Sequence, residues 1–342
     1  PSAYALYLRA TDIFNRRDTS QYDQAIAALQ QALQRDPNFA RAHSRLATLH
    51  SVSTAFAATS DRYRDAAEQA LFHAEQALQL NPLLAEPHAV MGALHRNARR
   101  YSEAQAAYNR ALQMDATDVT ANYWSALLKC ATGYVSRCEK GLDQTLTIDP
   151  ILPIALIWRA RMRLAEGDLE SAEGLLERAH VVGYRGAWLV ESWIALERGD
   201  LEDARKQTLD LITAVGVGLP PDAAQWIAGG RTGDAQARAQ ALKFIDDYLA
   251  DPPAPIDGLI PWSLVAIGEV DRGLTTFADY PTQNDLALLG DVMGARGRLV
   301  PEAWASPVFP EFLRKSGIAA YWDEFGPPEH CRKDAKGNYR CE

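Results

Sequence analysis

Small and apolar residues return along this chain at intervals that fit amphipathic helices, and the helices themselves return at a longer interval. Ala104 and Ala111, seven residues apart, lie on one face of a predicted helix. Steps of 34 residues from these two lead to further small residues, namely Ala70, Ala77, Cys138, Ala172 and Ala179. A step kept over several units indicates an internal repeat in which each unit is one pair of helices.

This pattern resembles the tetratricopeptide repeat, a 34-residue pair of antiparallel helices with small residues at positions 8, 20 and 27. In that register Gly92 stands at position 8 and Tyr101 at position 17 of one unit. The small residues let the two helices approach closely, and neighbouring pairs then stack. The resemblance implies an all-α fold of stacked helical hairpins.

A glycine followed by an acidic residue marks the turn within later helix pairs. The four examples are Gly167-Asp168, Gly199-Asp200, Gly233-Asp234 and Gly268-Glu269. Glycine adopts the left-handed conformation just after a helix, and the acidic side chain caps the next helix. We therefore predict a tetratricopeptide-type helix-hairpin solenoid of about eight helix pairs over residues 1–280.

Two segments depart from the repeat. Residues 51–60 form an insertion within the second unit, which we expect to be a flexible or ligand-facing loop. Residues 281–342 leave the pattern after one more helix, predicted for residues 286–293. Because an exposed end repeat would leave apolar surface uncovered, we expect residues 281–342 to form a C-terminal non-repeat cap.

Composition excludes several classes of function. The net charge is −9, and basic residues are interleaved with acidic ones, so this segment is not expected to bind nucleic acid or anionic lipid. No run of about 18 apolar residues is present. The chain opens at Pro1 without a methionine or a signal peptide. We interpret it as part of a longer polypeptide, and expect membrane attachment only through a missing N-terminal segment.

The four cysteines fall into two close pairs, Cys130/Cys138 and Cys331/Cys341. In the repeat register Cys130 and Cys138 face each other within one helical hairpin, near enough for a disulfide. Gly337, between the tail cysteines, favours a small loop that a second disulfide would close. Cysteines in local pairs are typical of an oxidising compartment. The alternatives are that Cys130 and Cys138 are reduced core residues, or that His330 joins the tail cysteines around a metal.

Catalytic and metal-binding motifs are not evident. His43 and His50, like His88 and His95, are seven residues apart on one helix face, which would suit metal ligands. Both pairs also occupy positions that normally hold packing aromatics, and we favour packing. No nucleophile elbow, phosphate-binding glycine loop or zinc-binding helix motif occurs. We predict no catalytic residue, no metal and no cofactor.

The repeat resemblance implies a binding groove, because the first helix of each pair lines the concave face in this family. Carried over by position, its candidate residues are Arg41, Arg96, Asn97, Tyr123, Trp124, Trp158, Arg161 and Trp193. Aromatic anchors beside an arginine are typical of binding hot spots. We expect a protein or peptide on this face, with a small molecule as a second possibility. The competing interpretation is that the tryptophans pack between repeats.

Chaperone-binding members of the family clamp a terminal carboxylate with Lys, Asn and Arg side chains. The corresponding positions here hold Ala89, Ala93, Trp124, Ile154 and Trp158. The clamp is absent, which argues against a co-chaperone role.

Both ends of the chain resemble one bacterial group. The segments are YALYLRA from Tyr4, SPVFPEFLR from Ser306, AYWDEFGPP from Ala320 and the closing Arg340-Cys341-Glu342. They are similar to the repeat region of membrane-embedded winged-helix regulators of the CadC type and of adenylate-cyclase-linked sensors. That architecture implies a DNA-binding or cyclase domain, one transmembrane helix, and repeats outside the inner membrane.

The resemblance gives two hypotheses of function. The first is a non-catalytic sensor or interaction domain on the periplasmic face of a bacterial inner membrane. The second is a free-standing repeat adaptor that assembles a multiprotein complex, for which a cytoplasmic location is the alternative.

Overall fold

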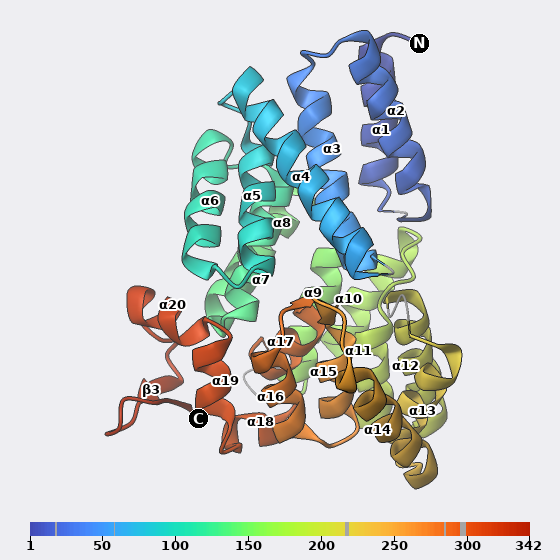
Figure 1. The fold of residues 1–342 in the computed structure, drawn as a ribbon, viewed down its shortest axis with the longest axis vertical. Coiled ribbons are helices and arrows are strands. Elements are labelled where there is room, and N and C mark those ends of the chain that lie inside the picture. Colours follow the sequence, from blue (N-terminus) through green and yellow to red (C-terminus); the bar gives the residue numbers. More distant parts are fainter. Residues whose placement is uncertain (18, 58, 216–218, 284, 295–298) are drawn as a thin grey trace. The chain divides into compact units, whose positions relative to one another are not determined.

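The computed structural model describes residues 1–17, 19–57, 59–215, 219–283, 285–294 and 299–342 (Figure 1). In these residues helices follow one another in antiparallel pairs, and two short two-stranded sheets complete the fold. The contacts divide the chain into two compact units. Unit 1 comprises Pro1–Ala57 and Asp61–Ser125, and unit 2 comprises Ala58–Ser60 and Ala126–Glu342. The all-α helical repeat fold predicted from the sequence is confirmed.

Unit 1 contains the first three helix pairs and the start of a fourth. The pairs are α1 (Ala3–Asn15) with α2 (Tyr22–Arg35), α3 (Ala40–Ser53) with α4 (Ser60–Leu80), and α5 (Ala85–Asn97) with α6 (Tyr101–Met114). The 3₁₀ turns η1 (Thr19–Gln21) and η2 (Thr54–Phe56) precede α2 and follow α3, and α7 (Val119–Ala131) begins in this unit. The expected loop at residues 51–60 is therefore mostly helical, and Ala58 lies outside the described residues.

Unit 2 contains the remaining pairs and the C-terminal segment. After α7 come α8 (Val135–Ile148), α9 (Pro153–Ala165), α10 (Leu169–Val181), α11 (Trp188–Glu197), α12 (Leu201–Val215), α13 (Pro221–Arg231), α14 (Ala235–Ala250), α15 (Leu259–Ala266) and α16 (Val270–Asp279). A parallel bridge joins β1 (Ile256–Asp257) to β2 (Thr282–Gln283). The segment that follows holds α17 (Leu286–Val292), α18 (Pro301–Ala305), α19 (Phe309–Lys315), α20 (Ile318–Phe325) and the hairpin β3 (Cys331–Lys333) with β4 (Tyr339–Cys341).

The turns within the later pairs have the predicted geometry. Gly167, Gly199, Gly233 and Gly268 all have positive φ. The Asp168 and Asp234 side chains accept backbone N–H bonds from the third residue along, as helix caps do. Glu269 instead pairs with Arg238, so the fourth acidic residue ties α16 to α14.

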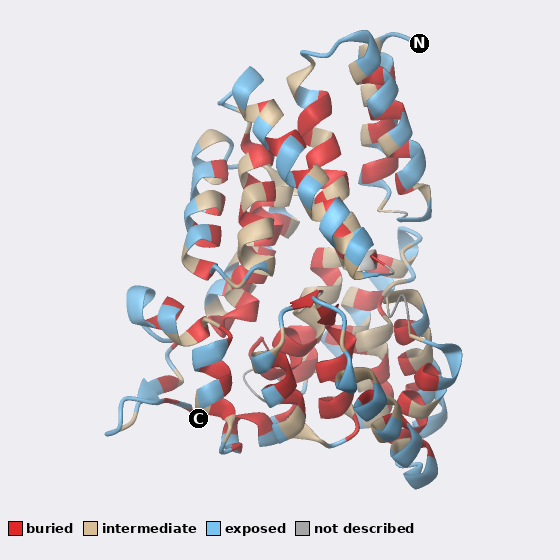
Figure 2. Ribbon diagram, in the orientation of Figure 1, coloured by how far each residue is buried: buried red, intermediate tan, exposed pale blue. Residues whose placement is uncertain are grey.

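Small residues stand where paired helices cross, and buried faces point between the helices (Figure 2). Ala70, Ala104 and Ala172 have no exposed surface. A Cβ added to Gly92 of α5 would lie 2.5 Å from Cε1 of Tyr108 in α6. The position-8 glycine is thus needed because a buried tyrosine ring from the partner helix occupies the space of a side chain.

The C-terminal segment packs on two different parts of unit 2. α19 covers the last helix pair, with the rings of Phe277 and Phe312 5.5 Å apart. The aromatic residues of α20 contact a different helix pair. Trp322 donates a 2.8 Å hydrogen bond to the carbonyl of Thr132, and Lys129 donates to the hydroxyl of Tyr321 at 2.6 Å. The tail therefore reaches back to the α7–α8 turn.

The repeat helices end at Asp279, next to the boundary expected at residue 280, whereas the division into units falls at residue 125. The boundary at 280 stays a prediction. In the part of the chain that is described, no helix combines the length and apolar character required to cross a bilayer.

Three histidines meet between α3 and α4 of unit 1. Nδ1 of His43 lies 2.9 Å from Nδ1 of His73, and the His50 ring stacks on His73 at 5.9 Å. Burial, and then the neighbouring imidazoles of His43 and His50, lower the pKa of His73 to about 4. Burial also lowers the pKa of His43, opposed by its hydrogen bond with the carbonyl of Pro37, and the pKa of His50, opposed by the carboxylate of Asp65.

Acidification should therefore destabilise unit 1. Between pH 6.5 and 4 the unfolded chain binds a proton at residue 73 that the folded chain excludes, so the unfolding free energy falls as pH falls through this window. His73→Gln removes this titration and should reduce the loss by about 2 kcal/mol. Urea unfolding followed by circular dichroism at pH 7 and pH 4 measures the difference. Equal losses in both proteins would show that His73 is not held neutral.

Candidate binding surface

The inner face of each unit is defined here by positions 2, 5, 6, 9, 12 and 13 of the first helix of each pair, where the sequence placed the groove. The structure does not leave all eight candidates accessible. Arg41 is exposed, while Arg96, Asn97, Trp158 and Trp193 are half-buried. Tyr123, Trp124 and Arg161 are buried. The role of these residues in binding stays a prediction.

In unit 2, Arg161 is held by the chain itself. Its guanidinium pairs with the carboxylate of Asp291 in α17 and donates to the carbonyl of Ala287 at 2.7 Å. The side chains of Arg161 and Asp291 are 6% and 1% exposed. A methyl group at Gly290 would overlap the guanidinium, so α17 lies directly on this arginine. A candidate for partner binding thus holds a segment about 130 residues further along the chain.

The buried carboxylate of Asp291 has a second donor. Nε1 of Trp262, in α15, donates to it at 2.9 Å. A carboxylate removed from water is stabilised when its lone pairs are filled in this way. Asp291 therefore joins α9, α15 and α17 through one group.

Arg231, at the end of α13, lies beside this cluster. It donates to the hydroxyls of Ser192 at 2.6 Å and Thr208 at 2.7 Å, and it lies over the ring of Trp193 at 4.6 Å. Burial lowers the pKa of Arg231 to about 10, opposed by the charge of Asp291. Trp193 of α11 stacks with Arg231 of α13, which favours the interpretation that it packs between repeats, whereas Trp158 stacks with Arg161 of its own helix α9.

The inner face of unit 1 is more polar. Glu86 of α5 accepts hydrogen bonds from Ser44 at 2.7 Å and Thr48 at 2.8 Å, both in α3, and Arg45 lies 3.4 Å away. Arg96 donates to Asn97 at 3.1 Å. Burial raises the pKa of Asp118, at the turn before α7, to about 6. Hydroxyl and carboxylate groups thus join the successive helix pairs of α3 and α5.

Two arginines of unit 1 share one aromatic ring. The guanidinium carbons of Arg17 and Arg45 lie 4.1 and 4.6 Å from the centroid of Phe14. Sequence reasoning missed both residues as candidates, although Arg17 at position 12 and Arg45 at position 6 occupy inner-face positions of the repeat.

A pocket of about 750 Å³ lies at the C-terminal hairpin of unit 2. Tyr134 and Arg137 line one side, and Trp304 and His330, stacked 4.9 Å apart, line another. Its volume is in the range of small-molecule sites. Sequence reasoning did not predict this pocket, because the hairpin and α8 are distant in the chain.

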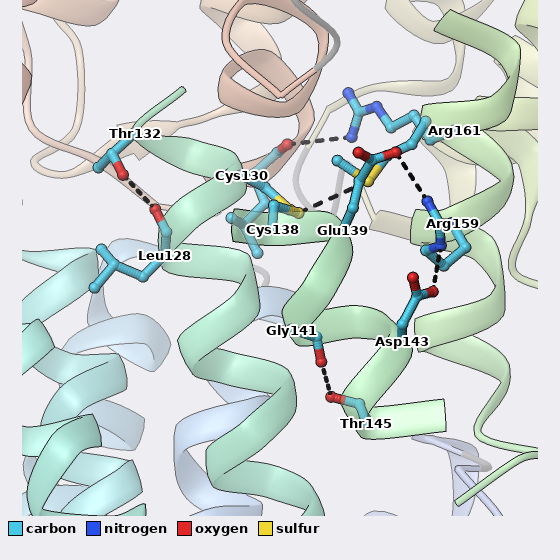
Figure 3. Close-up of a disulfide and its surroundings, with 12 residues drawn as sticks. Leu128, Cys130, Thr132, Cys138, Glu139, Gly141, Asp143, Thr145, Arg159 and Arg161 are labelled. Carbon is cyan, nitrogen blue, oxygen red and sulfur yellow. Dashed lines mark hydrogen bonds and ion pairs between the residues drawn. A yellow bond between two sulfur atoms is a disulfide. The ribbon is translucent and has the colours of Figure 1, made fainter. Parts of the chain in front are cut away.

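Both cysteine pairs have distances that suit disulfides. Cys130 of α7 and Cys138 of α8 point toward each other with a Cα–Cα distance of 5.1 Å (Figure 3). Arg159 of α9 holds α8 beside them, pairing with Glu139 at 3.1 Å and Asp143 at 2.8 Å. Cys331 and Cys341 are cross-strand partners in the tail hairpin, with a Cα–Cα distance of 4.1 Å.

No triad of histidine, cysteine or acidic side chains suited to a metal ion occurs among residues 1–342 outside the gaps given above.

Comparison with known proteins supports the repeat assignment. Residues 16–51 match a TPR repeat model and residues 85–118 a tetratricopeptide repeat model, the second in the register derived from Gly92. Tetratricopeptide repeats are therefore present in this chain. No match was found among curated protein sequences.

Among solved structures, that of the APC/C hetero-tetramer Cut9–Hcn1 has a TM-score of 0.54 at 14% identity, covering 91% of this chain and 55% of that chain. PilF of Pseudomonas aeruginosa (TM-score 0.41, 18% identity, 62% of this chain and 90% of that chain) is also similar. The type IV pilus biogenesis factor PilW is similar as well, with a TM-score of 0.42 at 22% identity over 62% of this chain and 92% of that chain. The Cut9–Hcn1 structure shows a shared helical fold alone, and identities this low do not establish a shared function.

Removing the Asp291 carboxylate should destabilise unit 2. Asp291→Ala leaves the buried charge of Arg161 unpaired and the Trp262 indole N–H without its acceptor, so the unfolding free energy should fall by about 3 kcal/mol. Urea unfolding followed by tryptophan fluorescence measures it, because seven of the eight tryptophans belong to unit 2.

The matched control is Asp246→Ala, which breaks an exposed pair with Arg272 and should cost less than about 1 kcal/mol. Similar losses in the two variants would mean that α17 does not depend on Asp291.

Proposed function

We propose that this chain is a non-catalytic interaction domain on the extracytoplasmic side of a bacterial inner membrane, acting as the sensor region of a membrane-bound regulator. Tetratricopeptide repeats typically bind protein or peptide partners, which supports the interaction role. The similarity of the two chain ends to CadC-type regulators supports the sensor role. A free-standing adaptor remains the alternative function.

The geometry of the cysteine pairs supports an extracytoplasmic location. Each cysteine has its partner within disulfide distance, and Cys130 and Cys138 have no exposed surface. In a cytosolic protein thiols are kept reduced, and paired cysteines there usually serve metals or redox chemistry. The absence of a metal triad among the described residues fits the structural role better.

The binding role is assigned to surfaces that the chain leaves open. Arg41, Arg96 and Asn97 retain exposed surface on the inner face of unit 1. On the inner face of unit 2, Arg161 is occupied by α17. The proposed partner is a protein or peptide at unit 1, and the pocket beside Trp304 and His330 is the proposed place for a small molecule.

A thiol count tests the location. Protein isolated from its host without reductant, with thiols trapped by acid and alkylated in denaturant, should show no free thiol. The same sample treated with reductant supplies the control and should show four, one per cysteine. Four free thiols before reduction would overturn the extracytoplasmic location.

A further inference from the structure

Arginines gather on the inner face of unit 1 although the chain as a whole has a net charge of −9. The charged residues at inner-face positions, within the described part of unit 1, are Arg17, Arg41, Arg45, Arg96 and Glu86. Four cations against one anion, or against two when Asp18 at position 13 of the first unit is counted from the sequence, give these positions a charge opposite to that of the whole protein. Such a local excess attracts anionic ligands against the general repulsion of an acidic surface.

Glu86, the carboxylate at an inner-face position in the described part of unit 1, does not satisfy all four arginines. Glu86 receives its short hydrogen bonds from Ser44 and Thr48, and Arg45 approaches it only at 3.4 Å. Its oxygens are therefore largely engaged by hydroxyl groups. The carboxyl of Asp118 is also near Arg45; although burial raises its pKa to about 6, it is mostly ionised at pH 7 and offsets part of the charge of Arg45.

Two guanidinium donors in this cluster are unpaired. Nε of Arg17 and Nε of Arg45 are buried and have no hydrogen-bond partner. The ring of Phe14 lies beside both groups and offers no acceptor oxygen. Burial lowers the pKa of Arg17, which a hydrogen bond with Tyr22 counteracts only in part. Buried unpaired donors are costly, so an incoming acceptor would be strongly favoured.

Carboxylate oxygens fit these donors best. A guanidinium presents its N–H groups in a planar fork that matches the two oxygens of a carboxylate, and the resulting charge-assisted bonds are short. Exposed Arg41 lies one turn before Arg45 on α3, and half-buried Asn97 lies on α5, so a bound chain would have further polar contacts along its length.

We propose that Arg17 and Arg45 form a carboxylate-binding site, and that its ligand is an acidic side chain of an extended peptide from a partner protein, with Arg41 at the rim. This inference rests on the proposed function, because it names the chemistry of the partner that the interaction domain binds. The residues differ from those of the chaperone clamp, which this chain lacks.

The test uses the full chain and a fluorescent hexaglutamate peptide, with binding followed by anisotropy at low salt. Hexaglutamine and hexalysine peptides carrying the same label are the probe controls. The wild-type protein should bind hexaglutamate more tightly than either control, and its affinity should fall as salt is raised. Equal binding of hexaglutamate and hexaglutamine would overturn the proposal.

Variants locate the site. Arg17→Gln/Arg45→Gln should weaken hexaglutamate binding at least about tenfold, because two charge-assisted contacts are lost. Arg35→Gln/Arg110→Gln removes the same charge from exposed positions on the second helices α2 and α6. It should leave the affinity within about twofold, as expected when only screened, distant charges change. Equal weakening in the two double variants would show a diffuse charge effect and overturn the site.

Arg41→Gln tests the site with a variant that is expected to fold normally, because this side chain is exposed and its loss should not disturb packing. With an unchanged circular dichroism spectrum it should still weaken binding about threefold, as a rim contact. No weakening would remove Arg41 from the site. If the cysteines are oxidised but the protein does not prefer hexaglutamate, this inference alone is wrong. If the thiols are free but hexaglutamate binds as predicted, only the extracytoplasmic location is wrong.

Discussion

The buried carboxylate of Asp291 binds Arg161 on the inner face of unit 2 and so keeps this arginine within the unit. It accepts from Arg161 and from the indole of Trp262, and both donors lie on first helices of repeat pairs. Removing one member of such a buried pair leaves an uncompensated charge that costs about 3–5 kcal/mol. The contact therefore holds α17 against α9 and α15. Arg161, a candidate for partner binding in the sequence, is thus engaged in a contact within the unit.

Unit 1 is built by the same repeat with different chemistry. Its first helices are joined by Ser44, Thr48 and Glu86, which form hydrogen bonds without large rings. The guanidinium groups of Arg17 and Arg45 keep unpaired Nε donors beside Phe14. The two units thus differ in whether their inner-face arginines have a buried carboxylate partner. Unit 2 supplies its own carboxylate to Arg161, and in our proposal unit 1 receives one from a partner.

The sequence predicted features that depend on local spacing. Gly92, the turn at Gly167 and the pairing of Cys130 with Cys138 follow from the 34-residue register, because that register fixes which residues of one hairpin meet. Long-range contacts were not predicted. Arg161 contacts Asp291, and Trp322 contacts Thr132 across 190 residues. The repeat period predicts which face of a helix is buried, but it does not predict which distant segment packs on that face. Arg231 was missed for the same reason, since its hydroxyl partners come from two other helices.

Hydrogen exchange of the α17 backbone tests most directly whether the inner face of unit 2 is filled by the chain's own segment. The amides of Leu289 and Met293 donate to the carbonyls of Asp285 and Leu289 at 3.0 and 2.8 Å. A helix this short is unstable alone and is protected only when packed. The account predicts that these amides exchange as slowly as those of α9. Exchange as fast as that of the exposed turn around Gly337 would contradict it.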